Sequence, residues 1–305
     1  MCPGILVIVM KSKLLPYRIL KYSRIGIKMR FKTPEFSFEL YHLMKYLNDC
    51  GSVSWKMSLN NIKMLAADDV PLSYIMKTHS FLNTNLSIFP KVLIPRNETE
   101  DYIMTLITQI KSSQFKNTEP IRILDLCSGS GCIALALACN LKRVEITAVD
   151  KLSICCINAR LNINRNISMI KYMQSQVNVV QGDLFSKDFK LDQKFDLIIS
   201  NPPYIPRNKI KNVDRNVLKF ESHTALFPTT CIRNGTNFHS RILRISQTLL
   251  RKGYNYSKNR FPKIILEING KDQIRPLKRV LKTLNFSKFE FKNDLGNVPR
   301  SVWIY

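Results

Sequence analysis

Short, continuous apolar runs alternate with amphipathic stretches through most of the chain after residue 120, the order expected of an α/β fold. The runs are short and rich in β-branched residues, so they predict strands covered on both faces of a parallel sheet. Two closing strands bring the count to seven, with ligands expected at the carboxyl ends of the strands. The predicted strands are 121–125, 146–149, 177–180, 195–199, 263–268, 287–292 and 301–305; helices are expected near 98–111, 236–251 and 271–284, and directly after Gly131.

The pattern before this sheet is different. Apolar positions recur at helical spacing over residues 38–47 and again over 58–67, so residues 35–79 are interpreted as a small helical domain. Residues 80–95 alternate around a turn at 83–85 and predict a β-hairpin that links this domain to the sheet. The sheet domain itself is then expected to run from residue 96 to the last residue, 305.

The first 34 residues form a basic arm without an acidic residue. Basic, acid-free N-termini of this length are typical of mitochondrial presequences, so we expect a mitochondrial matrix protein, with Met1 or Met10 as its start. A secretory signal fits worse, because the apolar run from Gly4 to Met10 is only seven residues long and no basic residue precedes it. The eight basic residues are Lys11, Lys13, Arg18, Lys21, Arg24, Lys28, Arg30 and Lys32.

The charge outside the basic arm and the spacing of the cysteines limit the kinds of partner and site that we expect. The chain carries a net charge of +25, and the basic arm accounts for eight of these charges. The net charge outside the arm has two interpretations. It forms a basic face that meets RNA or a ribosome-bound partner, or it reflects a lysine-rich composition whose charges are only solvated; the second is slightly favoured. The eight cysteines form no C-x-x-C pair and the four histidines are scattered, so neither a metal site nor a disulfide framework is expected. No apolar run approaches the ~20 residues of a membrane span.

A glycine-rich turn follows the first strand of the sheet. The strand ends in Asp125, the turn contains Gly129 and Gly131, and a helix begins after it. The glycines allow a tight turn and a close approach of the backbone to a ligand. Nineteen residues later the second strand ends in Asp150, which is well placed to bind ribose hydroxyls. The third strand runs into Asp183, where a carboxylate would meet an adenine amine.

The tetrapeptide Asn201-Pro202-Pro203-Tyr204 follows the fourth strand and carries the most chemical information. Two prolines make the turn stiff and leave its carbonyls without neighbouring N–H donors. The Asn201 side-chain oxygen and the Pro202 carbonyl can accept two hydrogen bonds from one planar –NH2 group, and Tyr204 offers a flat face beside it. The turn therefore predicts a site for an amide or an exocyclic amine. Together with Asp125 before the loop, it favours S-adenosylmethionine over NAD as the cofactor.

These motifs, in this order, resemble the HemK/PrmC family of glutamine N5-methyltransferases. The resemblance runs from about residue 65 to 305. Three residues depart from the family pattern: Cys127 replaces the first loop glycine, and Asn97 and Ser222 each replace a proline. A negative φ would suit Cys127, whereas a positive φ there would imply a different cofactor loop. The matching segments are 92–100 (LIPRPETE-like), 125–131 (DLGTGSG-like), 182–185, 200–205, and the pairs Phe220-Glu221 and Ala225-Leu226 (FEPxxAL-like).

The resemblance implies a Rossmann-like class I methyltransferase that modifies the Gly-Gly-Gln glutamine of a peptide-chain release factor, gripped by the helical domain. A monomer is expected. The alternative is a DNA or RNA amino-methyltransferase, which shares the tetrapeptide, would explain the charge and would have to flip a base out. The expected catalytic residues are Asn201, Pro202 and Tyr204; the same residues with Pro203, Arg96 and Glu98 bind substrate; Asp125, Cys127, Ser128, Gly129, Ser130, Gly131, Asp150, Asp183, Leu184 and Asn201 bind S-adenosylmethionine.

Overall fold

The computed structural model describes residues 18–22, 27–31, 70–113, 119–228, 234–251 and 261–305. The chain forms two units, Met1–Asp68 and Asp69–Tyr305. In the first unit, strands β1 (Arg18–Tyr22) and β2 (Ile27–Phe31) pair in antiparallel fashion. The predicted helices over 38–47 and 58–67 lie outside the described residues, as do most of the basic arm and most of the segment 35–79.

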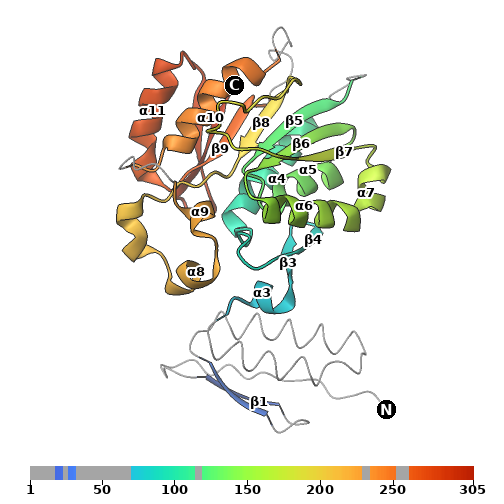
Figure 1. Cartoon of the computed structure of the whole chain (residues 1–305), viewed down its shortest axis with the longest axis vertical. Helices are drawn as coiled ribbons and strands as arrows, with labels where there is room; N and C mark the ends of the chain where they lie inside the picture. Colours follow the sequence, from blue (N-terminus) through green and yellow to red (C-terminus); the bar gives the residue numbers. More distant parts are fainter. Residues whose placement is uncertain (1–17, 23–26, 32–69, 114–118, 229–233, 252–260) are drawn as a thin grey trace. The chain divides into compact units, whose positions relative to one another are not determined.

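The second unit is built on the predicted seven-stranded sheet, with strand order β10-β11-β9-β8-β5-β6-β7 (Figure 1). The central strands pair in parallel, while β11 lies antiparallel between β9 and β10. The carboxyl ends of β5, β6, β7, β8 and β9 therefore meet at one edge. The strands are β5 (Ile121–Leu126), β6 (Val144–Asp150), β7 (Gln176–Gln181), β8 (Leu197–Ser200), β9 (Ile264–Glu267), β10 (Phe289–Asn293) and β11 (Pro299–Ile304).

Helices cover both faces of this sheet, and the apolar residues of each strand alternate between two cores. In β8, Ile199 packs in the core beneath one helical layer while Ile198 packs in the core beneath the other. Because both faces are covered, Leu197, Ile198 and Ile199 are all apolar, which explains the continuous runs in the sequence. One layer contains α4 (Asn97–Ser112), α5 (Cys132–Asn140), α6 (Ser153–Arg165) and α7 (Ile167–Tyr172); the other contains α10 (Asn237–Leu249) and α11 (Ile274–Thr283), which follows the short 3-10 helix η2 (Lys271–Gln273) (Figure 1).

A β-hairpin precedes the sheet, but it is shorter than predicted. Helix α3 (Leu72–Met76) leads into strands β3 (Thr78–Phe81) and β4 (Thr84–Ser87), with the turn at residues 82–83 rather than 83–85. The residues from 88 to 95 form no strand; within them the Val92 N–H donates to the Phe89 carbonyl at 3.1 Å in a turn. The Asn162 side chain on α6 both donates to and accepts from the Ser87 main chain, which fixes the hairpin against that helix.

A segment between β8 and α10 contains elements that the sequence pattern did not predict. It comprises η1 (Arg207–Asn212), α8 (Arg215–Phe220) and α9 (His223–Leu226), which together we call the flap. These helices are at most six residues long, and the first two have no buried residue, so no apolar periodicity marks them. The flap follows the Asn-Pro-Pro-Tyr turn directly and therefore lies beside the predicted site. No helix among the described residues is long and apolar enough to cross a membrane.

Candidate active site

The glycine-rich turn after β5 leaves open space at one glycine and close packing at the other. A side-chain carbon added at Gly129 would meet no atom within 4 Å, whereas one added at Gly131 would lie 3.0 Å from the Ala159 side chain on α6. Both glycines have positive φ values, 55° and 77°. Gly131 therefore permits close packing of the turn against α6, and Gly129 leaves room for a ligand to approach the backbone.

The φ of Cys127 is 60°, the positive value for which the sequence predicted a cofactor loop that differs from the family pattern. A side chain in this left-handed region costs about 1–2 kcal/mol relative to glycine. The turn still forms its backbone hydrogen bonds, from the Ser128 N–H to the Val149 carbonyl at 3.0 Å and from the Gly131 N–H to the Ser128 carbonyl at 2.8 Å. The turn therefore keeps these two hydrogen bonds with a cysteine at a position of positive φ.

Asp150 lies at the end of β6, next to this turn. One carboxylate oxygen accepts the Gly129 N–H and the other accepts the Leu152 N–H, each at 2.9 Å. Burial raises the pKa of Asp150, and these backbone donors oppose the rise. Each carboxylate oxygen has a further lone pair, so Asp150 can hold the loop and accept ribose hydroxyls at the same time.

Unpaired polar atoms gather around the same turn. Both carboxylate oxygens of Asp125 and the hydroxyls of Ser128 and Ser130 are buried without a hydrogen-bond partner in the part of the chain that the structure describes. Burial raises the pKa of Asp125 to about 8; nearby Asp150 adds to the rise, and the Ala134 N–H opposes it without meeting hydrogen-bond geometry. Buried polar groups are normally paired. A cationic, polar ligand such as S-adenosylmethionine would supply the missing partners.

Asp183 and Leu184 follow β7, the next strand along the same edge. The Asp183 carboxylate accepts the Phe185 N–H at 2.9 Å and forms an ion pair with Lys151 at 2.9 Å. The backbone donor and Lys151 lower the pKa of Asp183, so it is ionised near neutral pH. The Leu184 side chain is buried in the core, and its carbonyl accepts from Arg241. Adenine binding by this pair stays a prediction.

The Asn-Pro-Pro-Tyr turn lies against a cavity of about 540 Å3 on the flap side of the sheet edge. Asn201, Pro202 and Tyr204 line it, whereas Gly129, Asp150 and Asp183 do not. The cavity lining therefore includes the Asn-Pro-Pro-Tyr turn but not these residues of the predicted cofactor site. The other lining residues are Leu93, Arg96, Ile205, Lys209, Asn212, Val213, Val217, Ala225, Leu226 and Asn269.

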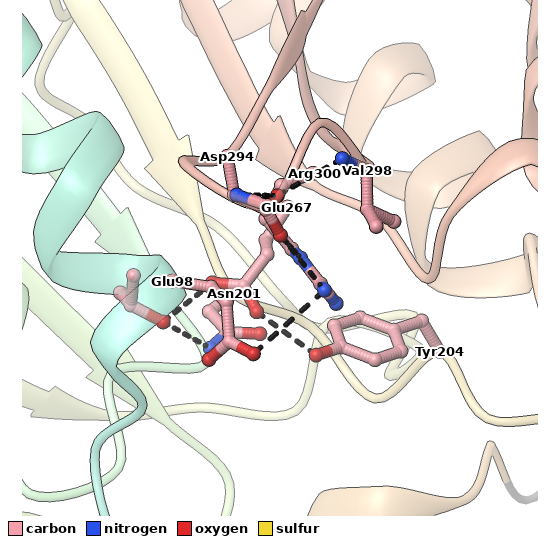
Figure 2. A network of polar contacts seen from close by, with 9 residues as sticks. Glu98, Asn201, Tyr204, Glu267, Asp294, Val298 and Arg300 are labelled. Atoms are coloured by element: carbon pink, nitrogen blue, oxygen red, sulfur yellow. Dashed lines mark hydrogen bonds and ion pairs between the residues drawn. The ribbon is translucent and has the colours of Figure 1, made fainter.

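A chain of hydrogen bonds runs behind Asn201 (Figure 2). The Asn201 side-chain NH2 donates to the Thr99 hydroxyl at 3.3 Å, and that hydroxyl donates to a Glu267 carboxylate oxygen at 2.6 Å. The Tyr204 hydroxyl donates to the other oxygen of Glu267 at 2.9 Å. Glu267 is 1% exposed, and burial raises its pKa. The carboxylate thus connects the two polar side chains of the tetrapeptide.

Arg96 lines the cavity but also forms a buried ion pair. Its guanidinium donates to both carboxylate oxygens of Glu221 at 2.8 and 2.9 Å, and Glu221 is 1% exposed. This pair ties the start of α4 to the flap.

Glu98 does not line the cavity. It lies 3.7 Å from Arg300, whose guanidinium also forms an ion pair with Asp294 at 3.0 Å (Figure 2). The structure brings Arg96 to the tetrapeptide, and it places Glu98 and the buried Pro203 outside the cavity lining.

Thr99, Glu267 and Arg300 were not predicted as site residues. For Glu267 a signal was present, since an acid ends the apolar strand β9, as Asp150 ends β6, and Asp125 is the next-to-last residue of β5. Thr99 lies in the family-like segment 92–100, but the sequence indicated no contact for it and gave no signal for Arg300, because each acts through a partner far along the chain. Among the described residues, no group of histidines, cysteines and acids could hold a metal ion, and the described cysteines are free.

Comparison with known proteins agrees with this geometry. Residues 106–229 match the family model of the methyltransferase small domain. A release factor glutamine methyltransferase of Flavobacterium psychrophilum is 30% identical over 276 residues, 87% of each chain, and one of Bacteroides thetaiotaomicron is 31% identical over 220 residues, 71% of this chain and 70% of that protein.

Among solved structures, the hMettl16 catalytic domain in complex with the MAT2A 3′UTR hairpin 6 superposes with a TM-score of 0.51. It is 17% identical and covers 80% of this chain and 92% of its own, so the likeness shows the fold alone. The matches confirm the Rossmann-like methyltransferase fold. The methyltransferase family model and the curated relatives confirm S-adenosylmethionine as the cofactor of this enzyme. With a curated relative 30% identical along most of both chains, the protein belongs to the family of release factor glutamine methyltransferases.

Proposed function

We propose that the enzyme transfers a methyl group from S-adenosylmethionine to the N5 amide nitrogen of the glutamine in the Gly-Gly-Gln motif of a mitochondrial release factor. The observation that carries the proposal is the placement of Asn201, Pro202 and Tyr204 on the wall of one cavity, with the Asn201 NH2 already engaged by Thr99. The Asn201 oxygen therefore remains to accept from a planar –NH2 group. The names of the curated relatives support the release-factor glutamine as the substrate.

The chemistry explains why an acceptor pair is needed. An amide nitrogen is a poor nucleophile because its lone pair is delocalised into the carbonyl, and its protons are too weakly acidic for a side-chain base to remove beforehand. Asn201 and the Pro202 carbonyl would accept both N–H groups and aim the nitrogen, while the Tyr204 ring lies against the amide plane. S-adenosylmethionine, when bound, supplies an electrophilic methyl group. Orientation of this kind can lower a barrier by several kcal/mol.

The cavity also suits the rest of a glutamine side chain. Apolar residues of the cavity wall, among them Ile205 before the flap and Val213 and Leu226 within it, offer contacts for its methylene groups. A cavity of about 540 Å3 lies in the size range of ligand pockets and has the volume for a glutamine side chain with its flanking glycines.

The test is transfer of a tritiated methyl group to purified release factors and, in parallel, to RNA, followed by mass mapping of the labelled residue. Label is expected on the Gly-Gly-Gln glutamine, and its replacement by alanine in the substrate should abolish it. Asn201→Ala should lower turnover by about 100-fold or more while the melting temperature is kept, because one oriented acceptor is lost. Near wild-type turnover in that variant, or label on RNA, would contradict the proposal.

The mitochondrial location rests on the acid-free residues 1–34 and needs its own experiment. A chain that lacks these residues should keep its activity in vitro but no longer accumulate in mitochondria, whereas the full-length chain should fractionate with the matrix. Residence of the full-length chain in the cytosol would refute the compartment and leave the chemistry standing.

A further inference from the structure

The Glu267 carboxylate lies behind the catalytic turn and accepts from two hydroxyls. Thr99 donates to one oxygen at 2.6 Å and Tyr204 donates to the other at 2.9 Å. Figure 2 shows Tyr204 beside Glu267. These bonds join three distant parts of the chain: the first turn of α4, the turn after β8 and the end of β9. Glu267 does not line the cavity, so it does not itself contact a substrate there.

The direction of these hydrogen bonds determines which atom of Asn201 faces the substrate. A carboxylate only accepts, so the Thr99 hydroxyl must use its single proton toward Glu267. The Thr99 oxygen is then left as an acceptor, and it takes a proton from the Asn201 NH2 at 3.3 Å. The Asn201 oxygen must therefore point the other way. An ionised Glu267 thus fixes the amide of Asn201 with its acceptor available to the substrate.

We propose that Glu267 is a positioning residue of the methyl transfer, which sets the orientation of the Asn201 amide through Thr99 and holds the Tyr204 hydroxyl directly. This inference rests on the proposed function for the identity of the methyl acceptor. The role goes beyond packing, because an apolar residue at position 267 would free both hydroxyl protons. A freed Thr99 proton would attract the Asn201 oxygen and turn the NH2, a donor, toward the incoming NH2 group.

Desolvation by burial raises the pKa of Glu267, and the groups around the carboxyl oppose this rise. The opposing groups are the hydroxyls of Thr99 and Tyr204, which donate hydrogen bonds to it, and the nearby Arg300 guanidinium. On the α10 side, His239 bonds to the Glu267 main-chain carbonyl at 2.7 Å. Burial lowers the pKa of His239 to about 4, so this ring is neutral near pH 7 and brings no competing charge.

From α4, Tyr102 also faces Glu267 and is neutral as well, because burial raises its pKa. Arg300 itself is held by Asp294 and Glu98. It is therefore fixed as the cation beside this carboxylate.

The experiment compares substitutions that keep or remove single hydrogen bonds. Thr99→Val removes the hydroxyl at nearly constant shape, whereas Thr99→Ser keeps it and is the matched control. Glu267→Gln keeps the shape but replaces one acceptor by a donor. Thr99→Val and Glu267→Gln should each lower kcat roughly 10- to 100-fold, the effect expected when a reacting group is no longer held in the correct orientation. The Kd for S-adenosylmethionine should change less than about twofold, and Thr99→Ser should restore most of kcat.

The decisive measurement repeats Thr99→Val in the Asn201→Ala background. If Thr99 acts through Asn201, the second substitution should cost less than about twofold in residual kcat, because nothing is left to orient. A purely structural role would instead multiply the two losses, and that result would overturn the proposal. The melting temperatures of all variants separate this outcome from a loss of folded protein.

The failure of this inference can be told apart from failure of the proposed function. The wild-type enzyme is first assayed on release factor and on RNA, and the variant series is run on whichever substrate accepts the methyl group. Label on RNA alone would sink the proposed substrate, while the coupling between Thr99 and Asn201 would still be read on that substrate. Glutamine labelling with independent losses at the two positions would refute only the positioning role.

Discussion

Replacing Asp125 by asparagine should stabilise the cofactor-free protein and at the same time weaken cofactor binding. The Asp125 side chain is fully buried, and neither oxygen has a hydrogen-bond partner among the described residues. Asparagine has nearly the same shape and no ionisable group. A residue that served only the fold would not show effects of opposite sign, so this single substitution separates a ligand role from a structural one.

The magnitude follows from the pKa of Asp125, which burial raises from 3.8 to about 8. At pH 7 Asp125 is ionised in the unfolded chain, whereas about nine-tenths of the folded molecules keep the carboxyl proton. This difference in proton binding lowers the free energy of unfolding by about 4 kcal/mol. An asparagine at this position cannot ionise, so it avoids this destabilisation. It buries an amide whose hydrogen bonds are not made, which costs roughly 1–3 kcal/mol of stability. The variant should therefore be about 1–3 kcal/mol more stable at pH 7 by the same reasoning.

The pH dependence has a definite sign. Between pH 4 and pH 8 the folded protein binds more protons at Asp125 than the unfolded chain, so this group lowers the free energy of unfolding as the pH rises. The advantage of Asp125→Asn should accordingly grow by about 1.4 kcal/mol per pH unit across this window and become constant above it. Urea unfolding at several pH values measures it. A difference that does not grow with pH would refute the assignment of the raised pKa.

The effect on cofactor binding is measured by calorimetry in two buffers of different ionisation enthalpy. S-adenosylmethionine carries a sulfonium and an ammonium group, and a cation beside Asp125 lowers the pKa of the carboxyl. Binding to the wild type should therefore release a fraction of a proton near pH 7, and the variant should release none and bind about 10- to 100-fold more weakly, as expected for a lost charged hydrogen bond. Equal affinity and equal proton release would show that Asp125 does not face the cofactor.

Three further outcomes follow from particular contacts. Cys127→Gly should be at least as stable as the wild type, and Cys127→Val less stable than the glycine variant by about 1–2 kcal/mol, because φ is 60° there; thermal unfolding ranks the three. Arg96→Met should lower the free energy of unfolding by roughly 3–5 kcal/mol by leaving Glu221 buried and unpaired, and adding Glu221→Gln should recover part of it in urea titrations. Gly235→Ala should abolish turnover in the methyl-transfer assay, because its added carbon would lie 2.0 Å from the main-chain oxygen of Tyr204, in the catalytic turn; retained activity would contradict this packing.

The sequence by itself determined the elements whose cause is local. The apolar runs became strands of the sheet, because a strand covered on both faces carries apolar side chains along most of its length. The ligand motifs follow the strands directly, so the parallel pairing of β5, β6, β7 and β8 was enough to bring them to one edge. The short helices of the flap escaped notice, since they bury too little to leave a periodic pattern.

Only the tertiary structure decided how these motifs are held. The hydrogen bond between Thr99 and Glu267 joins residues 168 positions apart, and Arg96 meets Glu221 across 125 positions. No local pattern encodes such pairs, because they depend on which strand lies next to which and on how the flap returns to α4. The left-handed backbone conformation of Cys127 was also decided by the tertiary structure. A cysteine alone favours negative φ, and the packing of the turn against its neighbours imposes the other sign.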